Sequence, residues 1–174
     1  MRKLEANEIE VKVKKVTDKG CLLLLYKTAR VDMQVLDETF GPQSWQCDYK
    51  TINGVLYCGI GVAYNNNGNI TWVWKWDCGI ESRADEDGNE KKGEASDAFK
   101  RAGFKWGIGR ELYTTPFIWA KVETTFLKDS NKWVLKNPFQ KFVVDTIEYN
   151  EKGEISYLLI TDEKGNKIFS GRTK

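Results

Sequence analysis

The chain has 174 residues, of which 41% are hydrophobic and 30% are charged, which is the balance of an ordinary globular domain. This balance excludes a disordered chain, and the longest purely aliphatic run, residues 22–25, is far too short to span a bilayer. A formal net charge of +2 does not by itself indicate nucleic-acid binding, so such a function has to be inferred from how the cations are distributed. We expect one domain over residues 1–174 and a cytoplasmic location.

The N-terminal third predicts a strand and then a helix. Hydrophobic and charged residues alternate from Ile9 to Lys14, the period of a half-buried strand. After an aliphatic run, Thr28 precedes a segment at residues 30–40 with hydrophobic residues at helical spacing, and Gly41-Pro42 follows it. The pattern predicts a helix that is capped by Thr28 and ends before Gly41.

Residues 45–80 predict a three-stranded antiparallel meander, because Asn-Gly pairs at 53–54 and 67–68 suit type I′ turns between strands 45–52, 55–64 and 70–80. Two-residue turns place Gly59 opposite Trp76, Gly61 opposite Trp74, and Lys50 on this same face. The other face then carries hydrophobic residues that we expect a helix to cover: Leu56, Cys58, Ile60, Val62 and Val73. A one-residue slip in the longer loop would exchange the two faces.

A charged loop and a long helix come next. Residues 82–92 are polar, with three acids at 85–87, and predict a loop. In the segment 93–113, Phe99, Ala102, Gly103 and Trp106 share one helical face, while the cations cluster toward its flank. Beyond Pro116 the sequence predicts strands near 124–127, 132–135, 141–149, 154–161 and 167–170.

No reaction centre assembles from sequence. Gly107-Ile108-Gly109 lacks the third glycine and the preceding strand of a dinucleotide-binding motif, and the acidic loop at 85–89 has its glycine misplaced for a calcium loop. The chain has no histidine, and its cysteines, which we interpret as reduced small hydrophobic residues, show no C-x-x-C spacing: Cys21, Cys47, Cys58 and Cys78. We expect no catalytic residue, metal or cofactor, although scattered carboxylates leave a metal-dependent nuclease as an alternative.

The long helix and the tryptophans each have two interpretations. Cations on a rigid helix neutralise phosphates and flat rings stack on bases, but most amphipathic helices have a charged face that is simply solvated. Trp72, Trp74 and Trp76 alternate along one strand, as a stacking platform would require, yet a core or subunit contact is the better interpretation of such an apolar stripe.

Two motifs occur together around the meander. A helix beginning at Arg30 leads to Phe40-Gly41-Pro42 and Trp45, and the long helix carries Ser-Asp-Ala-Phe-Lys-Arg-Ala at residues 96–102. With this order of parts, the chain resembles the Rad52 family of single-strand annealing recombinases, and looks most like the compact versions carried by bacteriophages. The resemblance covers residues 28–113, about half of the chain.

The resemblance implies a β-β-β-α core at about 28–113, in which the meander packs on the long basic helix. Together with the strand-rich extension that the turn and strand signals predict at about 117–174, we expect an α+β fold in one domain. The resemblance also implies oligomeric rings or arcs that hold single-stranded DNA in a basic groove. The family positions that line the groove correspond here to Arg30, Lys100 and Arg101. The DNA-binding residues we expect, with further cations added from the loop, the helix and the meander register, are Arg30, Lys50, Lys75, Lys91, Lys92, Lys100, Arg101 and Lys105.

The implied function is strand annealing in DNA recombination and repair, without catalysis, nucleotide triphosphate or cofactor. The expected partners are single-stranded DNA and further copies of the chain, with a single-strand-binding protein or an exonuclease as candidates, in the cytoplasm of a bacterial host if the gene is phage-borne. The chain departs from the family in its short meander, its acidic loop and its C-terminal strands. Three alternatives remain: a non-annealing single-stranded-DNA-binding protein, a module of double-stranded-RNA-binding type, and the metal-dependent nuclease.

Overall fold

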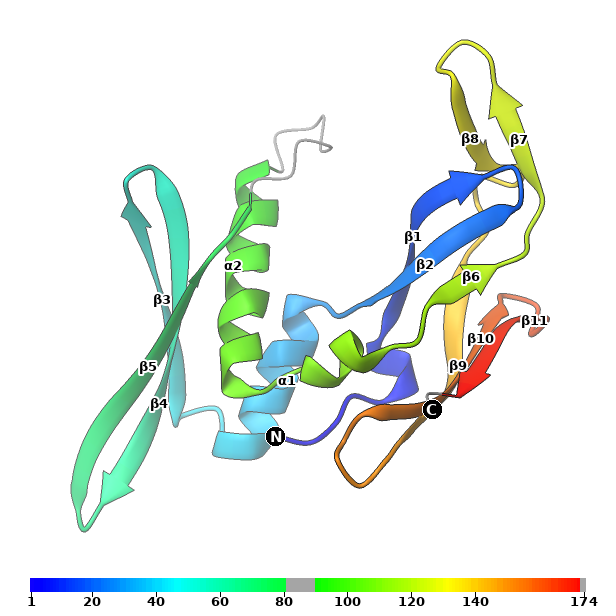
Figure 1. The fold of residues 1–174 in the computed structure, drawn as a ribbon. Coiled ribbons are helices and arrows are strands. Elements are labelled where there is room, and N and C mark those ends of the chain that lie inside the picture. The colour runs from blue at the N-terminus through cyan, green and yellow to red at the C-terminus, as the bar shows by residue number, and fades with distance from the viewer. Residues whose placement is uncertain (81–89, 173–174) are drawn as a thin grey trace. The chain divides into compact units, whose positions relative to one another are not determined.

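The computed structural model describes residues 1–80 and 90–172, and it confirms an α+β fold with a helix-packed meander and a strand-rich C-terminal part (Figure 1). The backbone divides into two compact units, which we treat separately. Unit 1 comprises residues 1–2 and 27–109, and unit 2 comprises residues 3–26 and 110–174. The acidic segment at residues 85–87, including the residues weighed as a calcium loop, lies outside the described residues. The expected domain limits stay a prediction.

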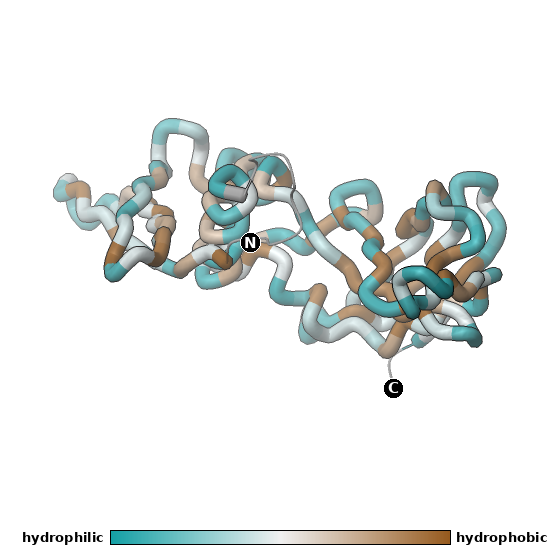
Figure 2. The backbone as a smooth tube through the Cα atoms, turned by 90° about the horizontal axis from the view of Figure 1, so that it is seen from above, coloured by the Kyte–Doolittle hydropathy of each residue, from teal (hydrophilic) through white to brown (hydrophobic). Residues whose placement is uncertain are grey.

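Unit 1 contains the predicted meander. Strands β3 (Trp45–Ile52), β4 (Val55–Asn66) and β5 (Asn69–Cys78) form an antiparallel sheet in that order. Asn53 and Gly54 have φ values of 51° and 78°, and Asn67 and Gly68 have 51° and 89°, so both hairpins turn as the Asn-Gly pairs predicted. Along the backbone, short hydrophilic and hydrophobic stretches follow one another closely (Figure 2). The two turns therefore fix the register of the whole sheet.

That register confirms the predicted faces, but the expectation that a helix covers Val73 is wrong, because Val73 is 44% exposed. Gly59 pairs with Trp76 and Gly61 with Trp74. The indole rings lie directly on the two glycines: a Cβ at Gly61 would stand 2.7 Å from the Trp74 ring, and one at Gly59 would contact the Trp76 ring as closely. Trp74 and Trp76 stack on each other, with ring centroids 5.6 Å apart. The glycines are thus required because a side chain at either position would displace a tryptophan.

The opposite face of the sheet is the core of unit 1. Helix α2 (Glu90–Trp106) packs on β4 and β5. The Nε1 of Trp106 donates a 2.9 Å hydrogen bond to the backbone carbonyl of Ile60, which ties the end of the helix to the central strand. The buried residues on the two sides are Cys58, Ile60 and Val62 from β4, and Ala98, Phe99 and Ala102 from α2. The amphipathic pattern of the long helix is therefore confirmed as a packing face.

Helix α1 (Ala29–Phe40) begins where predicted, because the Thr28 hydroxyl accepts a hydrogen bond from the Val31 amide at 3.3 Å. Its first turn also buries Asp32, a residue that the hydrophobic pattern did not single out. The Asp32 carboxylate accepts hydrogen bonds from Lys27 Nζ at 2.5 and 2.6 Å. A Cβ at Gly103 would stand 2.5 Å from Asp32 Oδ2, so α1 and α2 meet at this ion pair.

Unit 2 is a six-stranded sheet in the order β11-β10-β9-β1-β2-β6. The strands are β1 (Glu10–Thr17), β2 (Gly20–Tyr26), β6 (Ile118–Ala120), β9 (Phe142–Tyr149), β10 (Ile155–Asp162) and β11 (Lys167–Arg172). The predicted N-terminal and C-terminal strands are confirmed, whereas β2, β6 and two short 3-10 helices, η1 (Ala6–Glu8) and η2 (Arg110–Thr114), were not predicted. A separate two-stranded sheet pairs β7 (Thr124–Leu127) with β8 (Lys132–Leu135).

Candidate nucleic-acid interface

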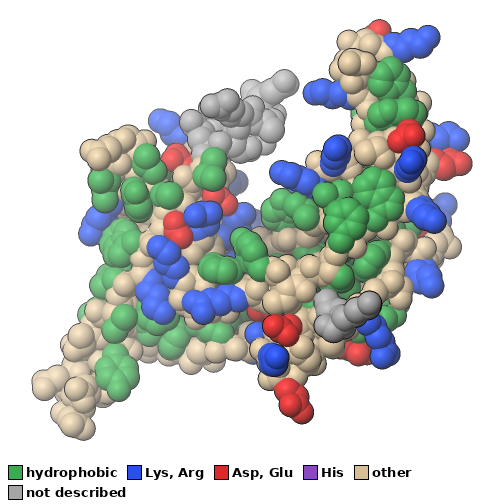
Figure 3. Space-filling view, in the orientation of Figure 1, with side chains coloured by type: hydrophobic (Ala, Val, Ile, Leu, Met, Phe, Trp, Pro, Cys, Tyr) green, Lys and Arg blue, Asp and Glu red, His purple; other side chains and the backbone are tan. Residues whose placement is uncertain are grey.

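Helix α2 presents its cations from a fixed frame. Ala98, Phe99 and Ala102 are fully or almost fully buried, so rotation of the helix about its axis would expose its hydrophobic face. Lys and Arg side chains, with carboxylates among them, lie over the region of α2 (Figure 3). We define the α2 basic surface as Arg30, Lys91, Lys92, Lys100, Arg101 and Lys105.

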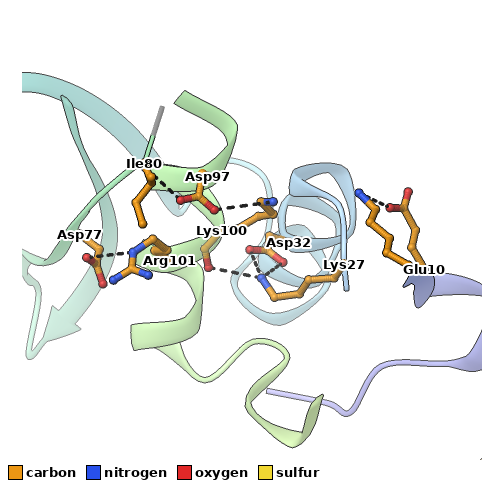
Figure 4. A network of polar contacts seen from close by, with 9 residues as sticks. Glu10, Lys27, Asp32, Asp77, Ile80, Asp97, Lys100 and Arg101 are labelled. Carbon is orange, nitrogen blue, oxygen red and sulfur yellow. Dashed lines mark hydrogen bonds and ion pairs between the residues drawn. The ribbon is translucent and has the colours of Figure 1, made fainter. Parts of the chain in front are cut away.

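Arg101 and Lys105 share one acidic partner on the neighbouring strand. The Asp77 carboxylate lies 3.4 Å from Arg101 Nε (Figure 4). It also lies 3.5 Å from Lys105 Nζ. Nearly half of each cationic side chain stays exposed, at 45% for Arg101 and 46% for Lys105. One carboxylate therefore holds two cations a helical turn apart while both remain accessible.

Lys75 lies beside Arg101 and Lys105, and its contacts are with α2 itself. Its Nζ donates to the backbone carbonyl of Lys105 at 3.0 Å and lies 4.2 Å from the centroid of the Trp106 ring. Lys105 in turn donates to the backbone carbonyl of Trp76. Lys75 thus caps one of the last carbonyls of α2, and its predicted contact with DNA stays a prediction.

Lys100 points to the other flank of α2, toward α1. Its Nζ lies 3.9 Å from an oxygen of Asp97, whose other oxygen accepts the Ile80 amide at 3.1 Å (Figure 4). The backbone carbonyl of Lys100 accepts a 3.3 Å hydrogen bond from Lys27 Nζ, next to the first turn of α1 that carries Arg30. Arg30 is exposed and makes no ion pair with any described residue. The first turn of α1, which carries Arg30, thus lies beside the part of α2 that carries Lys100.

Lys91 and Lys92 lie in the first turn of α2 and are exposed. The helix dipole makes positive charge unfavourable at a helix N-terminus. Helix stability therefore gives no reason for Lys91 and Lys92 at this end of α2. The rise of 1.5 Å per residue puts Lys92 about 20 Å from Lys105 along the axis. The α2 basic surface therefore extends along most of the helix.

Lys50 is separated from the other predicted residues. It lies on the tryptophan face of the meander, where its Nζ is 4.4 Å from the Trp76 ring centroid and 3.5 Å from an Asp48 oxygen. The sheet itself stands between this face and α2. A role for Lys50 in DNA binding would require a contact on the opposite face of the sheet, and it stays a prediction.

Sequence reasoning missed the two acids that organise these cations. Burial alone would raise the pKa of Asp77, but the Cys78 amide, Arg101 and Lys105 together lower it below its ordinary value, so Asp77 is a carboxylate at neutral pH. Burial raises the pKa of Asp32 to about 6, against the pull of Lys27. The meander register gave one signal for Asp77, since it places this residue on the helix-facing side of β5.

The described residues contain no helix that is long and apolar enough to cross a membrane. Within the same residues, no three side chains of Cys, Asp or Glu gather as a metal site requires.

The sequence matches the model of the Rad52/22 family double-strand break repair protein over residues 1–131. These residues include all of unit 1 and unit 2 as far as the turn between β7 and β8. This match is wider than the span of residues 28–113 expected from the motifs, since it also takes in β1, β2, β6 and β7. A comparison with curated proteins gives no match. Because the match spans about three quarters of the sequence, the chain belongs to the Rad52/22 family of double-strand break repair proteins.

Proposed function

We propose that this protein binds single-stranded DNA by its backbone along the α2 basic surface and anneals complementary strands without a nucleotide cofactor. The observation that carries the proposal is the pair Arg101 and Lys105, held by Asp77 on a helix whose other face is buried. Cations fixed in this way neutralise phosphates of any sequence and leave base edges free to pair. Membership of a double-strand break repair family supports DNA as the ligand.

Two groups of cations flank α2, and both would contact the strand. Arg101 and Lys105 lie toward β5, while Lys100 lies toward α1 and Arg30. Successive phosphates of one DNA strand could contact cations on either flank of α2. Such contacts would hold the strand along the helix axis. Lys91 and Lys92 would extend the same path toward the start of α2.

Oligomerisation is the second part of the proposal. In unit 1, β3 and β5 are the edges of a three-stranded sheet, and no described strand pairs with their outer sides. Long edges with exposed residues such as Ile70 and Val73 suit pairing or packing with another copy. A ring or arc would repeat the α2 basic surface, so that modest contacts in each subunit sum to tight binding. Such an annealing protein would act in the cytoplasm of a bacterial host if it is phage-borne.

The test is the annealing of two complementary oligonucleotides, one of them labelled, without nucleotide or metal and over a series of salt concentrations. We expect the wild type to accelerate pairing and Lys100→Ala with Arg101→Ala to reduce this at least tenfold. Two lost phosphate contacts should lower the magnitude of the single-strand salt slope by about 1.4. The matched control is Lys152→Ala with Lys167→Ala, which removes the same charge from exposed positions of unit 2.

Other results would contradict the proposal in distinct ways. Normal annealing by the Lys100 and Arg101 variant would mean that α2 does not hold the strand. Tight binding with slowed pairing would indicate a strand-protecting protein. Preference for duplex RNA would indicate an RNA-binding module, and strand cleavage when magnesium or manganese is added would indicate a nuclease.

A further inference from the structure

The β7–β8 hairpin of unit 2 exposes an aromatic pair. Phe126 and Trp133 are directly opposite in the register, and their ring centroids lie 5.4 Å apart at an angle of 55°. They are 42% and 38% exposed, and the described residues include no third strand in this sheet. Neither ring is therefore needed to fill a core, and both offer part of their faces to solvent.

A shallow groove of about 430 Å³ lies at the base of the same hairpin. Three lysines line it, Lys19 from the β1–β2 turn and Lys121 and Lys136 from the two sides of the hairpin. The remaining lining residues are Asp18, Val122, Glu123 and Thr124. Lys136 pairs with Glu123 at 3.0 Å, whereas Lys19 and Lys121 make no ion pair with any described residue. Two cations in the groove are thus available to an anionic ligand.

The groove and the aromatic pair are continuous. Thr124 lines the groove and stands two residues before Phe126 on β7, so the two side chains point to the same face of the hairpin. Two residues of a strand span about 7 Å, a distance that one nucleotide unit bridges between its phosphate and its base. Figure 3 shows hydrophobic side chains flanked by Lys and Arg side chains over this hairpin.

We propose that the β7–β8 hairpin is a second contact for single-stranded DNA, in which bases stack on Phe126 and Trp133 and the adjoining phosphates contact Lys19 and Lys121. Exposed rings beside unpaired cations match the two chemical features of a single strand, its flat bases and its charged backbone. We define the hairpin site as Lys19, Lys121, Phe126, Trp133 and Lys136. The family match ends at residue 131, in the turn of this hairpin, so Trp133 and Lys136 lie beyond it.

Charge favours a nucleic acid over a protein as the occupant. The groove and hairpin carry five lysines and three acids, because Lys128 and Lys132 with Asp129 join the residues that line the groove. Lys128 and Lys132 also make no ion pair with a described residue. Surfaces that bind proteins are depleted in lysine relative to the rest of the surface, whereas five lysines accompany the rings here.

Photo-crosslinking gives a direct test on the full-length protein. The probe is an oligo(dT) strand with 5-iododeoxyuridine at several positions, which crosslinks to aromatic side chains that stack on the base. Cleavage after lysine releases residues 122–128, with Phe126, and residues 133–136, with Trp133. We expect crosslinks on both peptides, and their absence from both would overturn the proposal.

Binding affinity gives the second test, in the Lys100→Ala with Arg101→Ala background so that the α2 basic surface does not mask the hairpin. Phe126→Ala with Trp133→Ala should weaken binding of labelled oligo(dT) at least tenfold, since two bases lose the rings on which they stack. Lys19→Gln with Lys121→Gln should weaken it and lower the magnitude of the salt slope. Phe139→Ala is the matched aromatic control, because Phe139 is 83% exposed and does not line the groove.

The two proposals fail separately. If the hairpin variants bind as their background does, the hairpin proposal is overturned while annealing through α2 stands. If the hairpin variants lose binding and the Lys100 and Arg101 variant does not, the hairpin site stands and the α2 proposal fails. A wild type that binds no oligo(dT) overturns both.

Discussion

The carboxylate of Asp77 on β5 lies 3.4 Å from the Nε of Arg101 on α2, and it also reaches Lys105 at 3.5 Å. The amide of Cys78 donates a 2.8 Å hydrogen bond to the same carboxylate and fixes its position. If these two cations bind phosphate as proposed, the acid takes the place of a phosphate oxygen beside them in the absence of DNA. It orients both cations and also competes with any strand for them.

Replacing Asp77 with Asn should therefore strengthen binding of single-stranded DNA several-fold at low salt, because it removes a negative charge beside two cations of the proposed DNA-binding surface. The magnitude of the salt slope should rise by up to about 0.7 if one more cation becomes available to phosphate. Fluorescence anisotropy with labelled oligo(dT) over a salt series measures both. Asp145→Asn is the matched control, because Asp145 is exposed on β9 of unit 2 and makes no ion pair with a described residue. Weaker binding by Asp77→Asn would show that orientation of Arg101 outweighs the competition.

Gly103→Ala should destabilise the protein although alanine is the better helix former. Helix propensity alone predicts a gain of about 1 kcal/mol. The new Cβ would stand 2.5 Å from Asp32 Oδ2, at the contact between α1 and α2, and the displaced carboxylate would lose its ion pair with Lys27. We expect a net loss of about 2 kcal/mol or more in the free energy of unfolding by urea. Equal or greater stability than the wild type would mean that the helices separate without cost.

The Lys27–Asp32 pair should make stability depend on pH. Burial raises the pKa of Asp32 to about 6, above the ordinary value of 3.8, so the folded state binds a proton more readily than the unfolded chain. For a carboxyl shifted in this direction, the contribution to stability is fully present below pH 3.8 and is lost as the pH rises through 6. The loss amounts to about 3 kcal/mol at full titration.

Urea unfolding between pH 4.5 and 7.5 measures this effect. Other carboxyl groups titrate as well, so the comparison is with Lys27→Met plus Asp32→Asn, which removes both charges of the pair. We expect the stability of the wild type relative to this variant to fall as the pH rises. A constant difference over this range would contradict the raised pKa.

Gly59→Ala should destabilise the meander, because a Cβ at this position would contact the Trp76 ring. We expect a loss of about 1–3 kcal/mol in the free energy of unfolding. In the background of Trp76→Ala, the same substitution should cost much less, since the ring that it displaces is gone. A double-mutant cycle by urea unfolding measures this coupling, and additive effects would show that the ring moves aside freely.

The meander could be predicted from sequence because its signals are local. Two Asn-Gly pairs with positive φ set both turns, and the period of two then places every residue of β4 and β5 on a face, including Gly59 and Trp76. The long helix was predicted for the same reason, since Phe99, Ala102 and Gly103 recur at helical spacing. Local chemistry thus specified the elements and their faces.

The partners of the charged residues could not be predicted, because they depend on contacts between segments far apart in the chain. Asp77 meets Arg101 across 24 residues, and Lys27 meets the carbonyl of Lys100 across 73. No pattern within a segment distinguishes an acid that holds a cation from one that is solvated. The same holds for β6, whose three residues pair with β2 from far along the chain.

The stacking of Trp74 and Trp76 on Gly61 and Gly59 has a consequence for how this sequence can change over time. A mutation that gives either glycine a side chain is harmful while the indole remains, and loss of an indole leaves bare backbone where the ring lay. Each glycine and its tryptophan must therefore be exchanged together or not at all. In relatives that have drifted far from this chain, we expect both members of such a couple to be kept, or both to be replaced.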